Sequence, residues 1–410
     1  MDDWVYENLN IAEAASKKGL CDHCLGRMFG KLGTGMTNLQ RASMIKEALL
    51  EKDITANVPD ECSLCGNIFD LLDRFADAAS EKLMTVETEN FLIGSRVDPE
   101  IEKNETKLWN DLGAENAEPL RSELNREIGK LVFSKIQRDV EFKNPQAVAC
   151  VDTRFADVTL DVAPVFIYGR YNKLSREIPQ TIWPCRVCRG KGCRRCNNIG
   201  KMYATSVQEI IGDIAADMCN AKEHSFHGMG REDIDALMLG TGRPFVLEIS
   251  DPVTRTIDLA ELERRANMSE LAKFNSLAFV SRDAVRAMKD SAATKTYLAR
   301  VKADNKINKE RVNEVARSFK DLCIDQRTPA RVEHRRADLV RRRKILWVKA
   351  DRINNDTFDL TMETESGTYV KEFVSGDGGR SRPSFSEALG IQCRVEELDV
   401  LAINDHGVIR

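Results

Sequence analysis

Eight of the twelve cysteines form pairs with the spacing Cys-x-x-Cys, a pattern that can hold a metal ion. Each pair presents two thiolates from one tight turn, and a tetrahedral zinc ion takes two such pairs. In a reducing cytoplasm, paired cysteines indicate metal before disulfide. No pair leaves an open position beside an obvious general base, so we expect one or two structural zinc sites. The first set is Cys21, Cys24, Cys62 and Cys65, and the second set is Cys185, Cys188, Cys193 and Cys196.

The two sets differ in how closely their pairs follow one another. A helical stretch around residues 38–52 separates the pairs of the first set, and His23 is a competing ligand that four thiolates would leave unneeded. Only four residues separate the pairs of the second set, where Gly190 and Gly192 would let the loop fold back. Redox-active pairs are the alternative, but the thioredoxin-like strand and helix around them are missing.

A dense acidic cluster lies among glycines in the second half of the chain. The segment 230–235 reads Gly-Arg-Glu-Asp-Ile-Asp, and Arg243 follows shortly after it. Composition alone favours a solvated loop. The apolar neighbours and the bracketing glycines instead favour a partly shielded turn, where a carboxylate near arginine could be reactive. Glu232, Asp233 and Asp235 all remain candidates on this ground.

The stretch GREDIDALMLGTGRPF, residues 230–245, resembles the catalytic motif of the archaeal and eukaryotic tRNA pseudouridine synthases that modify the T-loop at uridines 54 and 55. Its Gly-Arg-x-Asp part also resembles the signature of the wider pseudouridine synthase superfamily, and this likeness implies that Asp233 is the catalytic carboxylate. The stretch KTYLARV, residues 295–301, resembles the second motif of the superfamily. That motif implies that Tyr297 packs against the target base.

A third stretch, residues 367–373 (GTYVKEF) followed by residues 376–380, resembles the third motif of the superfamily. It implies that Tyr369 also contacts the uridine and that a basic residue, either Lys371 or Arg380, is the partner of the aspartate. The implied reaction breaks the N1–C1′ bond, rotates the uracil and rejoins it through C5, which requires no cofactor. The uridine must be extruded into a pocket that excludes water, where an aromatic ring replaces its lost stacking.

The resemblance to this family extends upstream of the catalytic motifs. The early cysteine pairs resemble an accessory zinc module, and residues 157–181 resemble the end of a THUMP domain, an RNA-binding module. We therefore expect a helical zinc-binding module at 1–66, a THUMP-like RNA-binding domain at 67–198 ending in the second cysteine set, and a catalytic domain at 199–410. The second cysteine set resembles archaeal members, which implies an archaeal source. The implied partner is tRNA, bound at its T-loop and T-arm and, through the THUMP-like domain, at its acceptor stem.

The elements that must position these residues can be read from hydrophobic periodicity and turn signals. Helices followed by strands indicate a small α/β domain, and the strand-rich second half indicates a mixed, mostly antiparallel sheet with flanking helices. The fold class is therefore α+β. A capping box at Ser206–Glu209 begins a new helix. Expected helices are 38–52, 68–83, 119–136, 259–271 and 312–322; expected strands are 147–152, 158–171, 245–249, 296–301, 345–350, 358–362, 368–374 and 395–403.

Charge and hydropathy give weaker information about partners and compartment. The net charge of −4 does not by itself favour nucleic acid, but residues 184–201 carry six basic and no acidic residues, and residues 331–344 carry seven basic against two acidic. The arginine-rich segment 326–344, which contains the second of these, is expected to contact tRNA phosphates. The polar N-terminus and the lack of a long apolar stretch indicate a cytoplasmic protein without a membrane span. Nothing in the sequence indicates an obligate protein partner.

Four rival functions share some of these features. A methyltransferase would need a glycine-rich cofactor loop after a strand, and a thiolation enzyme that uses ATP would need a phosphate loop; neither context is present. A glycoside hydrolase could pair Asp233 with Glu232 or Asp235. In an extended segment Asp233 and Asp235 share a face and Glu232 points away. A non-catalytic zinc-containing RNA-binding protein is the rival from another class.

Overall fold

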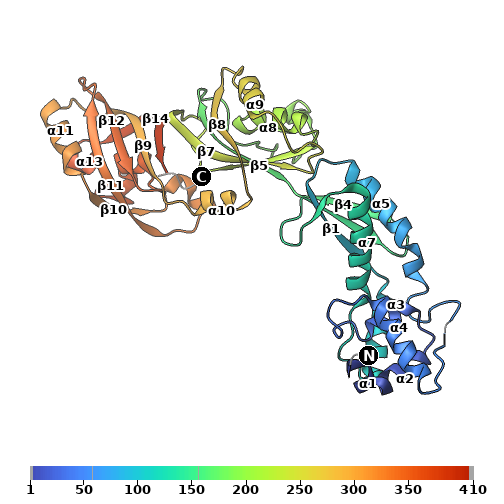
Figure 1. Cartoon of the computed structure of the whole chain (residues 1–410). Helices are drawn as coiled ribbons and strands as arrows, with labels where there is room; N and C mark the ends of the chain where they lie inside the picture. The colour runs from blue at the N-terminus through green and yellow to red at the C-terminus, as the bar shows by residue number, and fades with distance from the viewer. Residues whose placement is uncertain (1–2, 58, 156, 406–410) are drawn as a thin grey trace. The chain divides into compact units, whose positions relative to one another are not determined.

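The computed structural model describes residues 3–57, 59–155 and 157–405, and the chain divides into two compact units (Figure 1). Unit 1 comprises Met1–Ala163 together with Asp251–Arg255. Unit 2 comprises Pro164–Ser250 and Thr256–Arg410. Each unit has its own sheet, so each is described separately.

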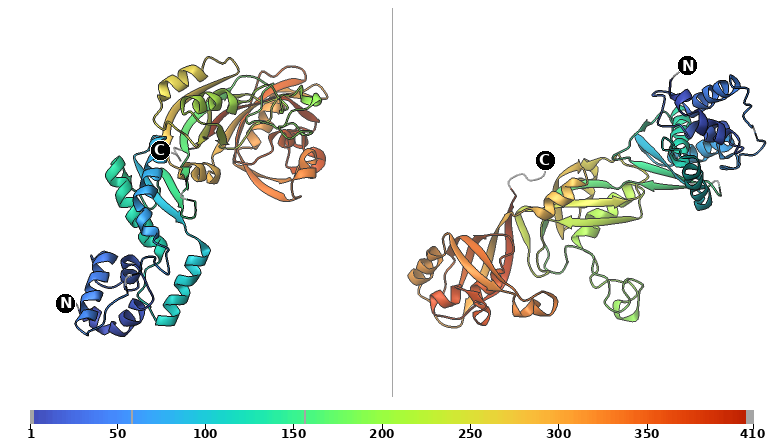
Figure 2. Two further views of the ribbon diagram at one scale, coloured as in Figure 1. Left: turned by 90° about the vertical axis from the view of Figure 1, so that its right-hand side faces the viewer. Right: turned by 90° about the horizontal axis from the view of Figure 1, so that it is seen from below.

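Unit 1 combines a helical N-terminal part with a four-stranded sheet of order β2-β1-β3-β4. β1 is parallel to β2 and β3, whereas β3 and β4 are antiparallel. Helices α5 and α7 pack against each other and against this sheet (Figure 2, left). The elements are α1 (Asp3–Glu7), α2 (Leu9–Ser16), α3 (Asp22–Arg27), α4 (Asn38–Leu50), η1 (Ile68–Leu71), α5 (Leu72–Met84), β1 (Asn90–Arg96), α6 (Pro99–Leu112), α7 (Leu120–Ile136), β2 (Asp139–Val140), β3 (Ala147–Asp152) and β4 (Asp157–Val162).

One continuous core runs through unit 1. Its buried side chains extend from the helices around the first cysteine set, such as Leu25 and Phe69, to the sheet residues Phe91 and Val151. Ile128 and other residues of α7 belong to the same cluster. The expected zinc-binding module at 1–66 and the sheet domain that follows it therefore share one apolar interior.

Unit 2 is built on a ten-stranded sheet of order β13-β10-β11-β12-β9-β14-β7-β5-β8, with β6 paired to β7. All of its pairings are antiparallel except that of β14 with β7, which confirms the expected mixed, mostly antiparallel sheet. The strands are β5 (Val165–Lys173), β6 (Glu223–Gly228), β7 (Met238–Ser250), β8 (Ala272–Val280), β9 (Thr294–Ala303), β10 (Leu322–Arg327), β11 (Val340–Asp351), β12 (Thr357–Thr364), β13 (Ser381–Arg382) and β14 (Cys393–Asn404).

Helices cover the two halves of this sheet and give unit 2 two cores. One core lies under α8 and α9 and contains Phe245 and Leu247; the other lies under α11 to α13 and contains Phe358 and Phe373. Among the described residues, no helix is long and apolar enough to cross a membrane. The helices are η2 (Arg194–Cys196), α8 (Val207–Met218), α9 (Leu259–Ala266), α10 (Asp283–Asp290), α11 (Lys309–Ser318), η3 (Ala330–Arg335), α12 (Val370–Ser375), η4 (Asp377–Gly379) and α13 (Phe385–Leu389).

The division between the units lies at Ala163/Pro164, not at the expected boundary of residue 198. The strand pattern expected at 158–171 is split there: β4 pairs with β3 in unit 1, whereas β5 pairs with β7 and β8 in unit 2. Pro164 explains the break, because proline has no N–H for a sheet ladder and ends a strand. The loop that carries the second cysteine set also belongs to unit 2 and projects from its sheet (Figure 2, right).

The expected strand at 368–374 is wrong, because the structure forms helix α12 over Val370–Ser375. The run is rich in residues that favour strands, which explains the prediction. Val370, Phe373 and Val374 are all buried. Their spacing of three and four places them on one face of a helix, and burial of that face decides the structure.

Candidate active site

The acidic motif forms a loop between β6 and β7, and Gly230 is the residue that lets it turn. Gly230 has a φ of 77°, in the left-handed region that favours glycine. A Cβ atom at this position would come within 3.0 Å of Lys295 Nζ and 3.3 Å of Arg243 Nη1. Glycine therefore allows the loop to pass close to two cationic side chains.

Glu232 anchors the loop through buried contacts and is therefore not available as a catalytic carboxylate. Its carboxylate is buried, pairs with Arg243 Nε at 2.9 Å and accepts a hydrogen bond from the Tyr171 hydroxyl at 3.0 Å. Gln180 Nε2 donates to the Tyr171 oxygen and to the carbonyl of Gly230. Burial raises the pKa of Tyr171, so the phenol stays protonated and can donate to the carboxylate.

Residues of β5, of the segment that follows it and of β14 fix the far end of the loop. Lys173 Nζ donates to the carbonyl of Ile234 at 2.6 Å, and Arg176 Nη1 donates to the carbonyl of Asp235 at 2.7 Å. Arg176 also forms an ion pair with Asp399 at 2.7 Å, and Asp399 accepts from the backbone N–H of Leu237. The loop is therefore held on both sides of Asp233.

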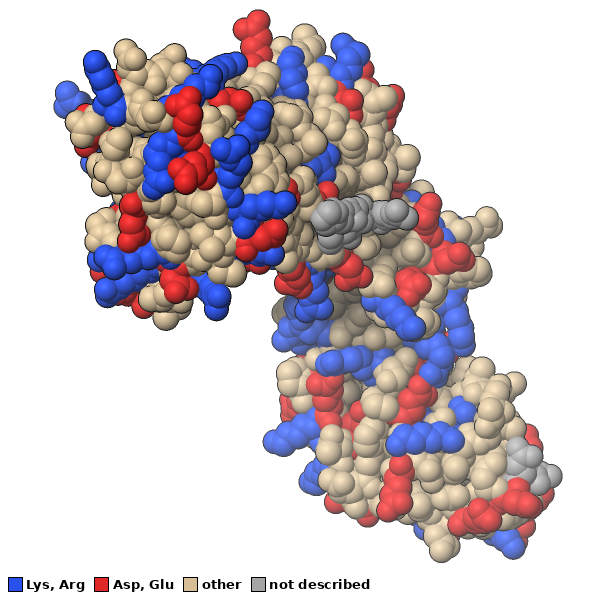
Figure 3. Space-filling model, turned by 90° about the vertical axis from the view of Figure 1, so that its left-hand side faces the viewer, with Lys and Arg blue, Asp and Glu red and all other residues tan. Residues whose placement is uncertain are grey.

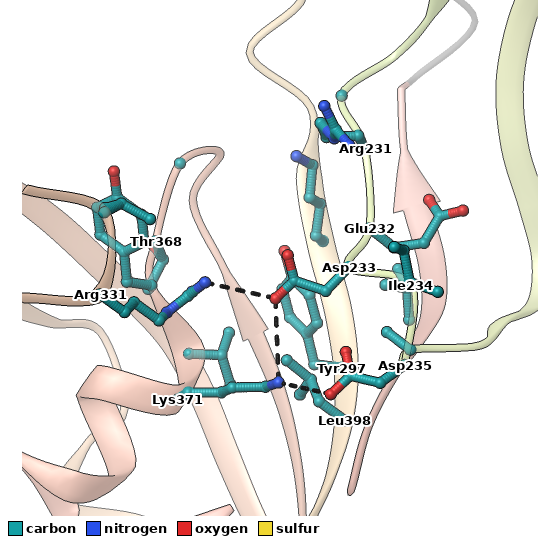
Figure 4. Close-up of a pocket in the computed structure, with 18 of the residues that line it drawn as sticks. Arg231, Glu232, Asp233, Ile234, Asp235, Tyr297, Arg331, Thr368, Lys371 and Leu398 are labelled. Carbon is teal, nitrogen blue, oxygen red and sulfur yellow. Dashed lines mark hydrogen bonds and ion pairs between the residues drawn. The ribbon is translucent and has the colours of Figure 1, made fainter. Parts of the chain in front are cut away.

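Asp233 stands at the centre of this fixed loop and faces two basic side chains (Figure 4). Its Oδ2 lies 3.6 Å from Arg331 Nη1 and 3.9 Å from Lys371 Nζ. Lys371 Nζ also lies 3.1 Å from Asp235 Oδ2, so it bridges the two aspartates. The other candidate partner, Arg380, hydrogen-bonds to the carbonyl of Thr328 and pairs with Glu333, away from Asp233.

The two tyrosines singled out by the motifs line the same pocket as Asp233, which has a volume of about 770 Å³. Tyr297 projects from β9 beside Asp233 (Figure 4), and burial raises its pKa. Tyr369 caps α12, and its hydroxyl accepts a hydrogen bond from Arg336 Nη1 at 2.9 Å. The structure therefore brings together Asp233, Tyr297, Tyr369 and Lys371, but not Arg380.

Four further aromatic or basic residues of the pocket wall had no role assigned from the sequence. Trp183 and Tyr203, at the two ends of the second cysteine loop, meet edge to face with their ring centroids 5.7 Å apart. Arg231 lies over the Trp183 ring at 5.6 Å. Lys295 also lines the pocket and is largely buried. The basic content of residues 331–344 pointed toward Arg331, but only the fold places it next to Asp233.

Both cysteine sets form clusters in which the four sulfur atoms lie within 4.8 Å of one another. Zinc–sulfur bonds of about 2.3 Å in a tetrahedron require sulfur atoms about 3.8 Å apart. The Sγ atoms of Cys21 and Cys65 are 3.7 Å apart, and those of Cys188 and Cys196 are 3.8 Å apart. The donors therefore fit tetrahedral zinc. The other four cysteines of the two clusters are Cys24, Cys62, Cys185 and Cys193.

The neighbours of the first cysteine set explain why His23 is not needed as a ligand. The His23 ring stacks on Phe69, with ring centroids 4.0 Å apart, and His23 Nδ1 hydrogen-bonds to Glu123 at 2.8 Å. Arg27 Nη2 donates to the Sγ of Cys24 at 3.3 Å, which places a positive charge beside the thiolates. The cluster is thus tied to α7 by side chains other than its own cysteines.

Comparison with known proteins agrees with this geometry. A family model described as "Pus10, C-terminal" matches residues 166–404, and one described as "Pus10 THUMP domain, archaeal" matches residues 75–152. The first match coincides with unit 2 and the second lies within unit 1. The fold and the site define an RNA-modifying enzyme with a THUMP domain and a pseudouridine synthase catalytic domain.

Relatives match along nearly the whole chain. The tRNA pseudouridine synthase Pus10 of Methanothrix thermoacetophila is 38% identical over 94% of this chain and 91% of the relative. Those of Methanopyrus kandleri and Pyrococcus furiosus are 37% and 38% identical and cover 97% and 96% of this chain, and 98% and 97% of their own lengths. The chain belongs to the Pus10 family of tRNA pseudouridine synthases. It is an isomerase that acts on tRNA, as the resemblance in the motifs implied.

A solved structure described as a Cbf5-Nop10-Gar1 complex contains a chain that is similar to part of this protein. The similarity covers 47% of this chain and 44% of that chain, with 17% sequence identity and a TM-score of 0.30.

Proposed function

We propose that this enzyme converts uridine 54, uridine 55 or both in the tRNA T-loop to pseudouridine, with Asp233 as the catalytic carboxylate. The observation that carries the proposal is the convergence of Asp233, Tyr297 and two basic side chains, Arg331 and Lys371, on one pocket of about 770 Å³. Glu232 is held by Arg243 and Tyr171. Of the two aspartates that are not buried, Asp233 faces both Arg331 and Lys371, whereas Asp235 pairs with Lys371 alone.

The chemistry needs a carboxylate beside the ribose and the base of a single uridine. The N1–C1′ bond breaks, the uracil rotates in place, and a C5–C1′ bond forms. The proton lost from C5 is balanced by one gained at N1. Electrons and atoms balance within the nucleotide, so no cofactor takes part. A closed pocket matters because water would trap the intermediate and turn isomerisation into hydrolysis.

The other residues of the pocket have positioning roles in this proposal. The Tyr297 ring packs against the flipped uracil, and such stacking contributes about 1–3 kcal/mol per base. Tyr369 contacts the same nucleotide from the α12 side. Lys371, together with Arg331, is the charge partner of Asp233. Arg380 contributes indirectly, because its guanidinium holds the carbonyl of Thr328 and the side chain of Glu333, next to Arg331.

We propose zinc as the metal of both cysteine clusters, with a structural role in each. Cys21, Cys24, Cys62 and Cys65 would close the helical N-terminal part onto the unit 1 core. Cys185, Cys188, Cys193 and Cys196 would close the loop whose two ends carry Trp183 and Tyr203. When bound, zinc supplies four bonds to sulfur and no open coordination position for chemistry.

The tRNA is proposed to lie with its T-arm against unit 2 and its acceptor stem against the THUMP domain of unit 1. The basic segment 331–344, which forms η3 and the start of β11, would contact T-arm phosphates.

Mapping of pseudouridine tests the assignment of position. Unmodified tRNA transcripts are incubated with the full-length enzyme alone, and pseudouridine is located at single-nucleotide resolution. Matched transcripts carry cytidine in place of uridine 54 or uridine 55. We expect product at one or both T-loop positions, and loss of product only at a replaced position. Product confined to another arm of the tRNA would contradict the proposed position, although the enzyme class would stand.

A further inference from the structure

Lys295 is a largely buried cation on the wall of the active-site pocket whose charge has no direct partner. It lies on β9, two residues before Tyr297, and lines the pocket together with Asp233. Among the described residues, no oxygen atom accepts a hydrogen bond from its Nζ and no carboxylate forms an ion pair with it. A buried ammonium group without a partner is costly, so such groups normally have one.

The surroundings of Lys295 leave an excess of positive charge. The charged groups that face it are Arg243, from β7, and Glu232, from the motif loop. Glu232 is already committed to Arg243 in an ion pair of 2.9 Å. Two cations therefore share one carboxylate. Burial and the charge of Arg243 lower the pKa of Lys295 to about 8, which Glu232 only partly offsets.

Lys173 shows what a purely structural buried lysine looks like in the same unit. Its Nζ donates to three backbone carbonyls, those of Ser175, Ile178 and Ile234, at 3.1, 3.2 and 2.6 Å. Every proton of that ammonium group has an acceptor within the protein. The ammonium group of Lys295 has none, and it borders a pocket instead of a packed core.

We propose that Lys295 is a positioning residue that binds a phosphate oxygen of the RNA backbone at the target nucleotide. The pocket receives one nucleotide of a polyanion. A phosphodiester next to that nucleotide carries one full negative charge, which would neutralise the excess positive charge that Glu232 leaves on Lys295 and Arg243. A charge-assisted hydrogen bond of this kind also fixes the position of the ribose relative to Asp233. The inference rests on the proposal that the pocket around Asp233 holds the target uridine.

The pH dependence of kcat/KM provides the first test, because this parameter reports ionisations of the free enzyme. With full-length enzyme and an unmodified tRNA transcript, we expect kcat/KM to fall as the pH rises through about 8, where Lys295 loses its proton. Lys295→Arg should remove this fall, since arginine stays charged. Lys295→Met should raise KM about 10- to 100-fold at neutral pH and show no further alkaline loss.

Two controls separate this effect from titration of the substrate and from loss of a surface charge. The same transcript is used throughout, so titration of the RNA itself would appear equally in Lys295→Arg. Lys349→Met removes an exposed lysine of β11 that pairs with Asp351 outside the pocket, and it should keep the wild-type pH profile. Circular dichroism melts of each variant check the fold, and Lys295→Arg keeps the test usable if Lys295→Met does not fold.

A neutral backbone linkage identifies the oxygen that Lys295 contacts. Transcripts with a methylphosphonate on the 5′ or the 3′ side of the target uridine should bind wild-type enzyme more weakly at one of the two positions, and Lys295→Met should not distinguish them. Equal binding at both positions by wild-type enzyme would overturn the proposal, because the acceptor would then be a carbonyl oxygen of the base. An alkaline fall that persists in Lys295→Arg would also overturn it. An active Asp233→Asn enzyme would instead reject the proposed function itself.

Discussion

At the scale of single residues, the three acidic side chains of the motif have different surroundings. Glu232 is buried against Arg243 and Tyr171, Asp235 is an exposed carboxylate near Lys371, and Asp233 faces both Arg331 and Lys371. Residue type alone could not show which of the three carboxylates is catalytic. Their different contacts show Glu232 anchoring the loop and support the catalytic role proposed for Asp233.

Comparison of two variants tests which basic residue is the partner of Asp233. Lys371→Met removes a charge 3.9 Å from the Asp233 carboxylate and should lower kcat by about 100-fold. Arg380→Met removes a charge that is bonded to Thr328 and Glu333, so it should change KM more than kcat. Single-turnover rates with saturating enzyme measure the chemical step. A larger loss of rate in Arg380→Met than in Lys371→Met would contradict the assignment.

Stacking by Tyr297 predicts a graded response to substitution. Tyr297→Leu removes the aromatic face and should weaken apparent substrate binding by about 10- to 100-fold, in line with 1–3 kcal/mol per stacked base. Tyr297→Phe keeps the ring and should lose less binding. Measurement of KM for both variants decides between stacking and a simple packing role, since equal losses would argue against stacking.

At the scale of elements, the ion pair of Glu232 and Arg243 joins the motif loop to β7. Both side chains are about 1% exposed, and Arg243 also donates to the carbonyl of Met229. Glu232→Gln leaves Arg243 buried without its carboxylate and should destabilise the folded enzyme by about 3–5 kcal/mol. Asp235→Asn, on the exposed side of the same loop, serves as the control. A denaturant or thermal melt in which both variants match wild type would contradict the anchoring role of Glu232.

The second cysteine cluster should hold the loop that carries Trp183 and Tyr203 at its ends. Two clusters predict two zinc ions per chain, and Cys188→Ser should leave one. Because the loop borders the pocket, loss of this ion should raise KM for tRNA. The melting temperature of unit 1, which holds the first cluster, should stay the same. Metal analysis by mass spectrometry measures the stoichiometry, and a wild-type chain without zinc would reject the metal assignment.

What the sequence could predict depended on how local each feature is. The cysteine spacing predicted both clusters, because each pair is closed by a single turn. The strand predicted at 368–374 was wrong, because burial of Phe373 and Val374 against the second core of unit 2 decides the helix. The role proposed for Lys295 could not be predicted from the sequence, since its place on the pocket wall arises only when β9 packs beside the motif loop.

At the scale of the whole molecule, the net charge of −4 gives no overall attraction for a polyanion. On the face shown in Figure 3, lysine and arginine are interspersed with aspartate and glutamate. Binding of tRNA must therefore depend on local basic segments and not on long-range attraction by the whole protein.

Salt dependence of binding measures the contribution of one such segment. The affinity of the full-length enzyme for tRNA should fall steeply and linearly on a double-logarithmic plot against salt concentration. Arg342 is an exposed side chain of residues 331–344, and Arg342→Gln should weaken binding and lower the slope by about 1. An unchanged slope would show that this arginine does not contact phosphate.

Catalysis by Asp233 can be tested by comparing Asp233→Asn with Asp235→Asn. Each variant is incubated with an unmodified tRNA transcript without cofactor, tRNA binding is measured in parallel, and pseudouridine is mapped. We expect Asp233→Asn to bind tRNA but to form no pseudouridine, and Asp235→Asn to form product at the same position as wild type. Pseudouridine formed by Asp233→Asn, or product lost only in Asp235→Asn, would contradict catalysis by Asp233.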